Sequence, residues 1–103
     1  MSQSYEIWIE AEVRAEDRQL PSNMNTDVHV TFQDGIVWMA TFLTYDNIAT
    51  LVSRYRQSGE CLYGTYFWAS DMILIERIDR PTIERVIADL LESGEFHLAF
   101  TAA

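Results

Sequence analysis

An Asp-Gly pair between two apolar segments is the feature that most restricts the fold of this 103-residue chain. Residues 28–32 alternate between apolar and polar side chains, and an apolar segment follows the pair at residues 36–43. Alternation with a period of two is typical of a half-buried strand, and Asp34-Gly35 is a strong signal for a tight turn. Residues 28–43 are therefore predicted to form an antiparallel β-hairpin.

A two-residue turn fixes the pairing of this hairpin. It places Phe32 opposite Val37 and Val30 opposite Met39, so that this face is the predicted core face. The other face carries a second apolar row, which consists of Ile36, Trp38, Ala40 and Phe42. Because monomers rarely leave such a row open to water, we expect the helices, residues 95–100 or a second copy to cover it.

Two helices are predicted from apolar side chains that recur with helical spacing. The first follows cap residues at 44–46 and ends before Gly59, and the second has Pro81 in its first turn and ends before Gly94. The two stripes match at a spacing of 35 residues, and both helices end in Ser-Gly-Glu, which indicates a repeated architecture. The stripes are Ile48, Leu51, Val52 and Tyr55 in the first helix, and Ile83, Val86, Ile87, Leu90 and Leu91 in the second.

The remaining segments complete an α+β fold. Residues 5–13 alternate as a strand, residues 14–26 are polar and are predicted to form a long loop, and residues 61–69, 72–78 and 95–100 are predicted strands. The predicted fold is a single domain over residues 1–103, with an antiparallel sheet of about five or six strands and two helices in β-ββα-ββα-β order.

The charge of the chain excludes several classes of partner. Sixteen acidic residues oppose seven arginines, there is no lysine, and the net charge is −9. Such a surface repels phosphate, so binding to nucleic acid or to an anionic membrane is not expected, whereas a basic protein partner is favoured. No secretory signal or membrane-spanning run occurs, and a single cysteine predicts a reducing, cytoplasmic location.

The residues with reactive side chains do not form a catalytic or metal-binding motif. Cys61 follows the end of a predicted helix, where the dipole disfavours a thiolate, so it is predicted to be structural. Neither a zinc-like spacing of Cys and His nor a phosphate-binding glycine loop is present.

A pair of glutamates is the remaining candidate for catalysis. Glu10 and Glu12 would stand about 6.5–7 Å apart on a strand, a spacing that acid–base pairs use, but charged strand faces are mostly solvated. We expect no enzymatic activity and no cofactor.

Two sets of residues are candidates for binding a partner. The first is the outward face of the first strand, and the second is an aromatic segment around Gly64 in which tyrosine and tryptophan can act as anchors. The candidate residues are Glu6, Trp8, Glu10 and Glu12 in the first set, and Tyr63, Tyr66 and Trp68 in the second.

In size, acidic charge and general style the chain resembles small bacterial immunity proteins, which neutralise a toxin by blocking its active site. The resemblance implies a protein-binding module with a basic partner. Two alternatives stay open from the residues alone. One is a small-ligand-binding domain or enzyme with a pocket between sheet and helices. The other is a homodimer of purely structural role that hides the face of Trp38 and Phe42.

Overall fold

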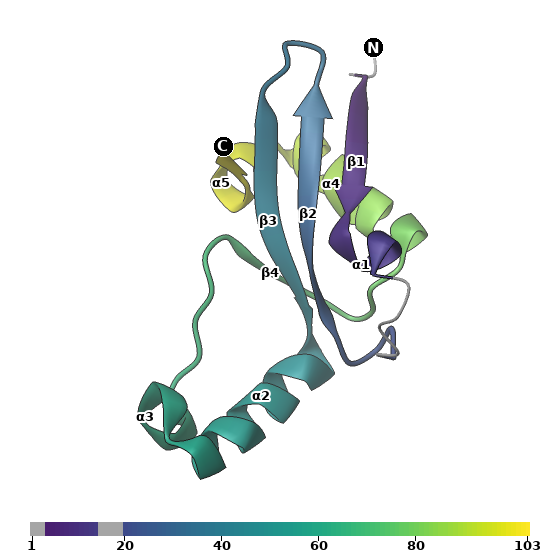
Figure 1. The fold of residues 1–103 in the computed structure, drawn as a ribbon. Helices are drawn as coiled ribbons and strands as arrows, with labels where there is room; N and C mark the ends of the chain where they lie inside the picture. Colours follow the sequence, from purple (N-terminus) through teal and green to yellow (C-terminus); the bar gives the residue numbers. More distant parts are fainter. Residues whose placement is uncertain (1–3, 15–19) are drawn as a thin grey trace.

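The computed structural model describes residues 4–14 and 20–103, and it contains one five-stranded sheet with helices on one side (Figure 1). The α+β class predicted from the sequence is confirmed, the sheet is antiparallel as predicted apart from the pairing of residues 41–44 with residues 72–75, and two of the helices are long. The elements are β1 (Tyr5–Ile9), α1 (Glu10–Val13), β2 (Asn25–Phe32), β3 (Val37–Thr44), α2 (Tyr45–Ser58), α3 (Glu60–Gly64), β4 (Met72–Ile75), α4 (Arg80–Ser93), α5 (Phe96–Ala99) and β5 (Thr101–Ala102).

The strand order is β1-β2-β3-β4, with β5 paired to β3 as well. The pairs β1–β2, β2–β3 and β3–β5 are antiparallel, whereas β4 runs parallel to β3 beside residues 41–44. A parallel neighbour needs a long crossover, and here α2, α3 and residues 65–71 provide it. The order of elements after β3 therefore differs from the predicted hairpin-plus-helix repeat.

The hairpin of β2 and β3 has a three-residue turn, so the predicted register is wrong by one residue. Gly35 adopts a φ of 84° and donates its backbone N–H to the carbonyl of Phe32 at 3.0 Å. Phe32 in turn donates to the carbonyl of Ile36 at 3.2 Å, which leaves three residues in the turn, the arrangement of a type I turn with a glycine bulge. Val30 consequently pairs with Trp38 rather than with Met39.

The change of register decides which face of the sheet is buried. Val30 and Phe42 are fully buried, while Met39 lies on the opposite face. The predicted cover over the row of Trp38 and Phe42 is confirmed, because α5 packs there, with Phe96 edge-on to Trp38 and Phe100 edge-on to Phe42. The buried apolar core also includes Ile9, Met24, Val28, Ala40, Ile75, Ile78, Ile83 and Ile87.

The two long helices begin and end as the sequence predicts. The Thr44 hydroxyl accepts a hydrogen bond from the backbone of Asn47 at 3.2 Å, and the Asp79 carboxylate accepts one from Thr82 at 2.8 Å. Both are N-caps, which satisfy backbone donors that the first helical turn leaves without a partner. Gly59 and Gly94 end α2 and α4 in the left-handed conformation.

Four predicted strands differ from the structure. The strand predicted over residues 72–78 is shorter, because β4 ends at Ile75. The first strand ends at Ile9, because Ala11 donates its backbone N–H to the hydroxyl of Thr26 at 2.9 Å and the chain curls into α1. Residues 61–69 form the short α3 and irregular chain instead of a strand. Residues 96–99 form α5, and only Thr101–Ala102 extend the sheet. Of the predicted loop at 14–26, residues 15–19 lie outside the described residues and residues 25–26 belong to β2.

The molecule is elongated, with extents of 49 × 28 × 21 Å. Helix α2 leaves the end of β3 and projects away from the sheet with α3 at its tip (Figure 1). We call residues 45–69 the arm and the rest of the chain the body. Within residues 4–14 and 20–103, no helix is long and apolar enough to cross a bilayer.

Candidate protein-binding surfaces

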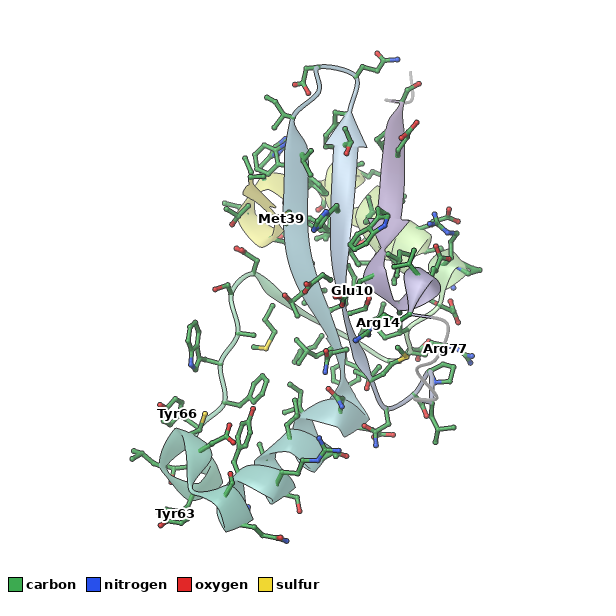
Figure 2. All side chains as sticks on the ribbon, in the orientation of Figure 1. Glu10, Arg14, Met39, Tyr63, Tyr66 and Arg77 are labelled. Carbon is green, nitrogen blue, oxygen red and sulfur yellow. The ribbon has the colours of Figure 1, made fainter. Side chains whose placement is uncertain are left out.

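Among the described residues, no helix covers one face of the sheet, and we call this the open face. Helices α4 and α5 both lie behind the sheet in Figure 1, and Figure 2 looks onto the open face with Met39 labelled. The pairing of β1, β2 and β3 determines which side chains share this face. They are Glu6 and Trp8 from β1, Asp27, His29 and Thr31 from β2, and Val37, Met39 and Thr41 from β3.

A tryptophan stands in the middle of β1 on this face. Trp8 pairs with His29, which pairs with Met39, so the three side chains form one row across the strands. The rings of Trp8 and His29 have their centroids 4.7 Å apart, and 42% of Trp8 remains exposed. Binding anchors are often large aromatic side chains that pack against a neighbouring residue and keep part of their surface exposed to solvent.

A small hollow lies at the other end of this row. Its volume is about 200 Å³, and its walls are Asp27, His29, Met39, Ala40, Thr41, Ser70 and Asp71. The carboxylate of Asp27 accepts a hydrogen bond from the hydroxyl of Thr41 at 3.2 Å, and the carboxylate of Asp71 accepts one from Thr101. Asp71 is further fixed because its carbonyl accepts from the backbone of Thr41 at 3.0 Å. Two oriented carboxylates in a hollow can receive a guanidinium or ammonium group.

The structure divides the first candidate set between two places. Glu6 and Trp8 lie on the open face, as the alternation of residues 5–9 predicts. Glu10 and Glu12 belong to α1, so they do not continue the strand row. Glu10 lies 3.8 Å from Arg14, which reduces the charge that it presents to a partner.

Glu12 points to α4 rather than to the open face. Its carboxylate accepts hydrogen bonds from Arg80 at 2.7 and 2.9 Å. This pairing holds the pKa of Glu12 below its usual value, with the hydrogen bond as the largest cause, and it raises the pKa of Arg80. No sequence pattern marks this contact, because the two residues are 68 positions apart.

The second candidate set lies on the arm. Tyr63, Tyr66 and Trp68 are 68%, 50% and 67% exposed, and Leu62 beside them is 69% exposed. Cys61, Leu62 and Tyr63 have φ values of 51–55°, so α3 is a left-handed turn. This conformation costs on the order of 1–2 kcal/mol per residue in an ordinary chain, and here it turns apolar side chains toward solvent.

The arm itself has little apolar burial. Asn47 is the one buried residue of α2, all of which the structure describes, and none of its apolar side chains is buried. Tyr55 stacks on Phe67 with centroids 6.2 Å apart, and Gly64 approaches α2 so closely that an added Cβ would lie 2.8 Å from the carbonyl of Val52. Thus the segment after α2 folds back on the helix without enclosing it.

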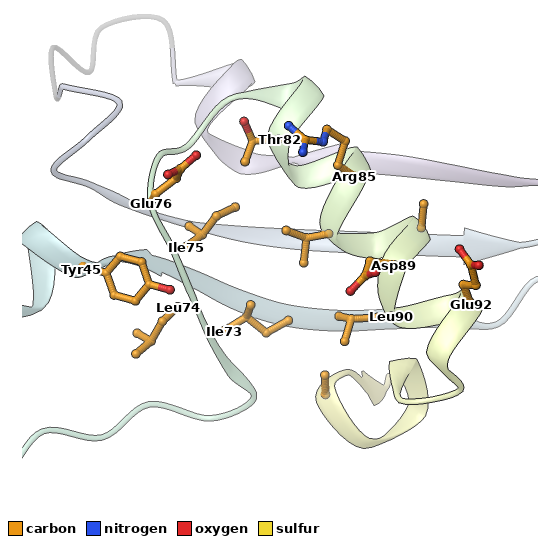
Figure 3. Close-up of a pocket in the computed structure, with 13 residues that line it drawn as sticks. Tyr45, Ile73, Leu74, Ile75, Glu76, Thr82, Arg85, Asp89, Leu90 and Glu92 are labelled. Carbon is orange, nitrogen blue, oxygen red and sulfur yellow. The ribbon is translucent and has the colours of Figure 1, made fainter.

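A wider groove separates β4 from α4 on the helix side of the sheet (Figure 3). Its volume is about 720 Å³, and Ile73, Val86 and Leu90 are among its apolar lining residues. The charged side chains of Arg85 and Asp89 stand around its rim rather than converging on one point. A small-molecule site usually has a few polar groups that converge on the ligand, so this groove offers less specific chemistry than the hollow.

The residues with chemistry-bearing side chains lie apart. Cys61 belongs to the arm, whereas both histidines belong to the body, where His29 contacts Trp8 and His97 contacts Trp38. Among the described residues, no group of three or more His, Cys, Asp or Glu side chains is arranged to hold a metal ion.

The comparisons with known proteins add no relationship to this geometry. No family model matches the chain, and neither a curated protein nor a solved structure matches it.

Proposed function

We propose that this protein is a binding module for a basic protein partner, and that the partner docks on the open face. The observation that supports this most directly is the hollow formed by Asp27 and Asp71 at the end of the row that begins with Trp8. An arginine or lysine of the partner would enter the hollow, and an apolar part of the partner would pack on the exposed tryptophan.

The distribution of charge supports a basic partner. Residues 45–69 contain two acids and two arginines, so the arm is neutral and the body carries the whole net charge of −9. A charge of this size accelerates association with an oppositely charged protein, while buried aromatic contacts mainly slow its dissociation. Neutralisation of a basic toxin is the biological role that suits such a module, and it is the role that the resemblance to immunity proteins suggests.

Binding of a fluorescein-labelled oligo-arginine peptide tests the proposal. The wild-type protein should raise the anisotropy of this peptide and leave an oligo-glutamate peptide unaffected. The double variant Asp27→Asn/Asp71→Asn keeps the acceptor oxygens that Thr41 and Thr101 use. It should bind the basic peptide about tenfold more weakly, because hydrogen bonds to charged groups contribute about 1.5–3 kcal/mol.

The matched control removes the same two charges elsewhere. Asp89 and Glu92 lie on α4, on the opposite side of the sheet, so Asp89→Asn/Glu92→Gln also removes two negative charges without changing the open face. This variant should bind almost as well as the wild type. Equal losses in the two double variants would mean that the peptide responds to net charge alone, and the proposed site would then be abandoned.

A further inference from the structure

The arm has more apolar surface than a stable isolated helix should expose. The stripe of α2 is only half-buried, and four large side chains around α3 leave at least half of their surface open. At about 150–250 Å² per large side chain, these four expose on the order of 500 Å². With the stripe of α2 added, the arm approaches the roughly 800 Å² per partner of a standard protein interface. The four side chains are Leu62, Tyr63, Tyr66 and Trp68.

The charge of the arm indicates which partner covers it. Because the arm is neutral and the body carries −9, a basic protein is attracted to the body rather than to the arm. Two copies of this chain repel each other through their bodies. The projecting arm is where two copies can approach while their bodies stay apart (Figures 1 and 2).

We propose that the arm is a self-association surface, and that two copies pair their arms antiparallel about a twofold axis. Antiparallel pairing aligns the dipoles of the two α2 helices favourably and leaves the two bodies at opposite ends of the dimer. This proposal does not depend on the function of the open face.

Sedimentation equilibrium of the purified full chain tests the proposal. The wild type should have about twice its chain mass of 11.9 kDa at concentrations well above the dissociation constant. Tyr66→Ser/Trp68→Ser should weaken the dimer about a thousandfold, because anchor residues commonly contribute about 2 kcal/mol or more each. Leu98→Ser is the matched control, since Leu98 is 85% exposed on α5 of the body and its replacement should leave the dimer intact.

Circular dichroism confirms that Tyr66→Ser/Trp68→Ser and Leu98→Ser are folded.

Three results would overturn the proposal. They are a wild-type protein that stays monomeric at its highest soluble concentration, an arm variant that dimerises as well as the wild type, and a Leu98→Ser variant that dissociates equally. Each result leaves the oligo-arginine experiment on the open face unaffected, so the two proposals can fail separately.

Discussion

Arg80 joins the first strand and α1 to α4. Its guanidinium donates to the carboxylate of Glu12 at 2.7 and 2.9 Å, to the carbonyl of Ile7 at 2.9 Å and to Glu84 at 3.4 Å. A planar guanidinium can make several such bonds at once, so it fixes the N-terminal segment more firmly than a lysine could. Glu12 is thus part of the contact between α1 and α4.

Replacing Glu12 with glutamine should destabilise the protein in a manner that depends on pH. The pKa of Glu12 is lower in the folded state than in the unfolded state. Its ionised form therefore stabilises the fold at pH values above the unfolded-state pKa, and this contribution is lost as the pH falls through the folded-state pKa. Near pH 7 the loss should be about 0.5–1 kcal/mol, because the pair is partly exposed to solvent. Urea unfolding at several pH values measures it, and the difference from the wild type should disappear well below pH 4.5.

The neighbouring glutamate provides the control for this experiment. Glu10 is 3.8 Å from Arg14, a longer contact, and Glu10→Gln should change the free energy of unfolding by less than about 0.5 kcal/mol. If Glu12→Gln has the same small effect at every pH, the hydrogen bonds from Arg80 do not contribute to stability.

At the scale of residues, sequence patterns predicted correctly only those side-chain positions that depend on neighbours in the chain. Glu6 and Trp8 share the open face because alternation holds over residues 5–9. The pairing of Glu12 with Arg80 could not be predicted, since it depends on how α4 returns to the N-terminus. The hollow was missed for the same reason, because Asp27 and Asp71 meet only when β2 and the segment before β4 approach β3.

Helices α2 and α4 share a pattern of apolar residues but have different surroundings. Each has 14 residues, an N-cap and a left-handed glycine at its end. Helix α4 packs on the sheet and buries Ile83 and Ile87, whereas α2 buries Asn47 alone. Their shared apolar pattern correctly predicted two helices, but it did not distinguish a helix that packs on the sheet from one that projects away from it.

The same substitution in both helices should measure this difference. Ile48 and Ile83 occupy corresponding positions, but Ile83 is fully buried and Ile48 is half-buried. Ile83→Ala should lower the free energy of unfolding by about 2–5 kcal/mol, and Ile48→Ala should cost less than about half as much in dilute solution. Urea unfolding determines both values. Equal losses would show that α2 is packed as tightly as α4, which contradicts the projecting arm.

The elements that were predicted wrongly depend on backbone conformations that apolar patterns do not reveal. The hairpin was located correctly by Asp34-Gly35, yet the bulge at Gly35 added one residue to the turn and reversed the faces of β3. Residues 61–69 have the aromatic composition of a strand, but the left-handed residues 61–63 turn the chain back on α2. Composition therefore gave the class of fold, and turn geometry decided its topology.

At the scale of the whole molecule, charge and apolar surface are separated. The body carries all of the net charge of −9, and the neutral arm carries the exposed aromatic residues around α3. In a chain that is 49 Å long, this separation gives two surfaces with opposite physical character. The acidic body suits an oppositely charged partner, and the arm suits an uncharged apolar contact.

Salt should therefore affect the two proposed interactions in opposite directions. Raising sodium chloride from about 0.1 to 1 M shortens the Debye length from about 10 to 3 Å. The attraction between oligo-arginine and the body should weaken severalfold, whereas dimerisation should strengthen, because the repulsion between two bodies of charge −9 is screened while the apolar arm contact remains. Anisotropy titrations and sedimentation equilibrium at each salt concentration measure the two constants. Sulfate is avoided because it strengthens apolar contacts by exclusion from the surface. If dimerisation also weakens with sodium chloride, the copies associate through opposite charges, and the arm would not be their contact surface.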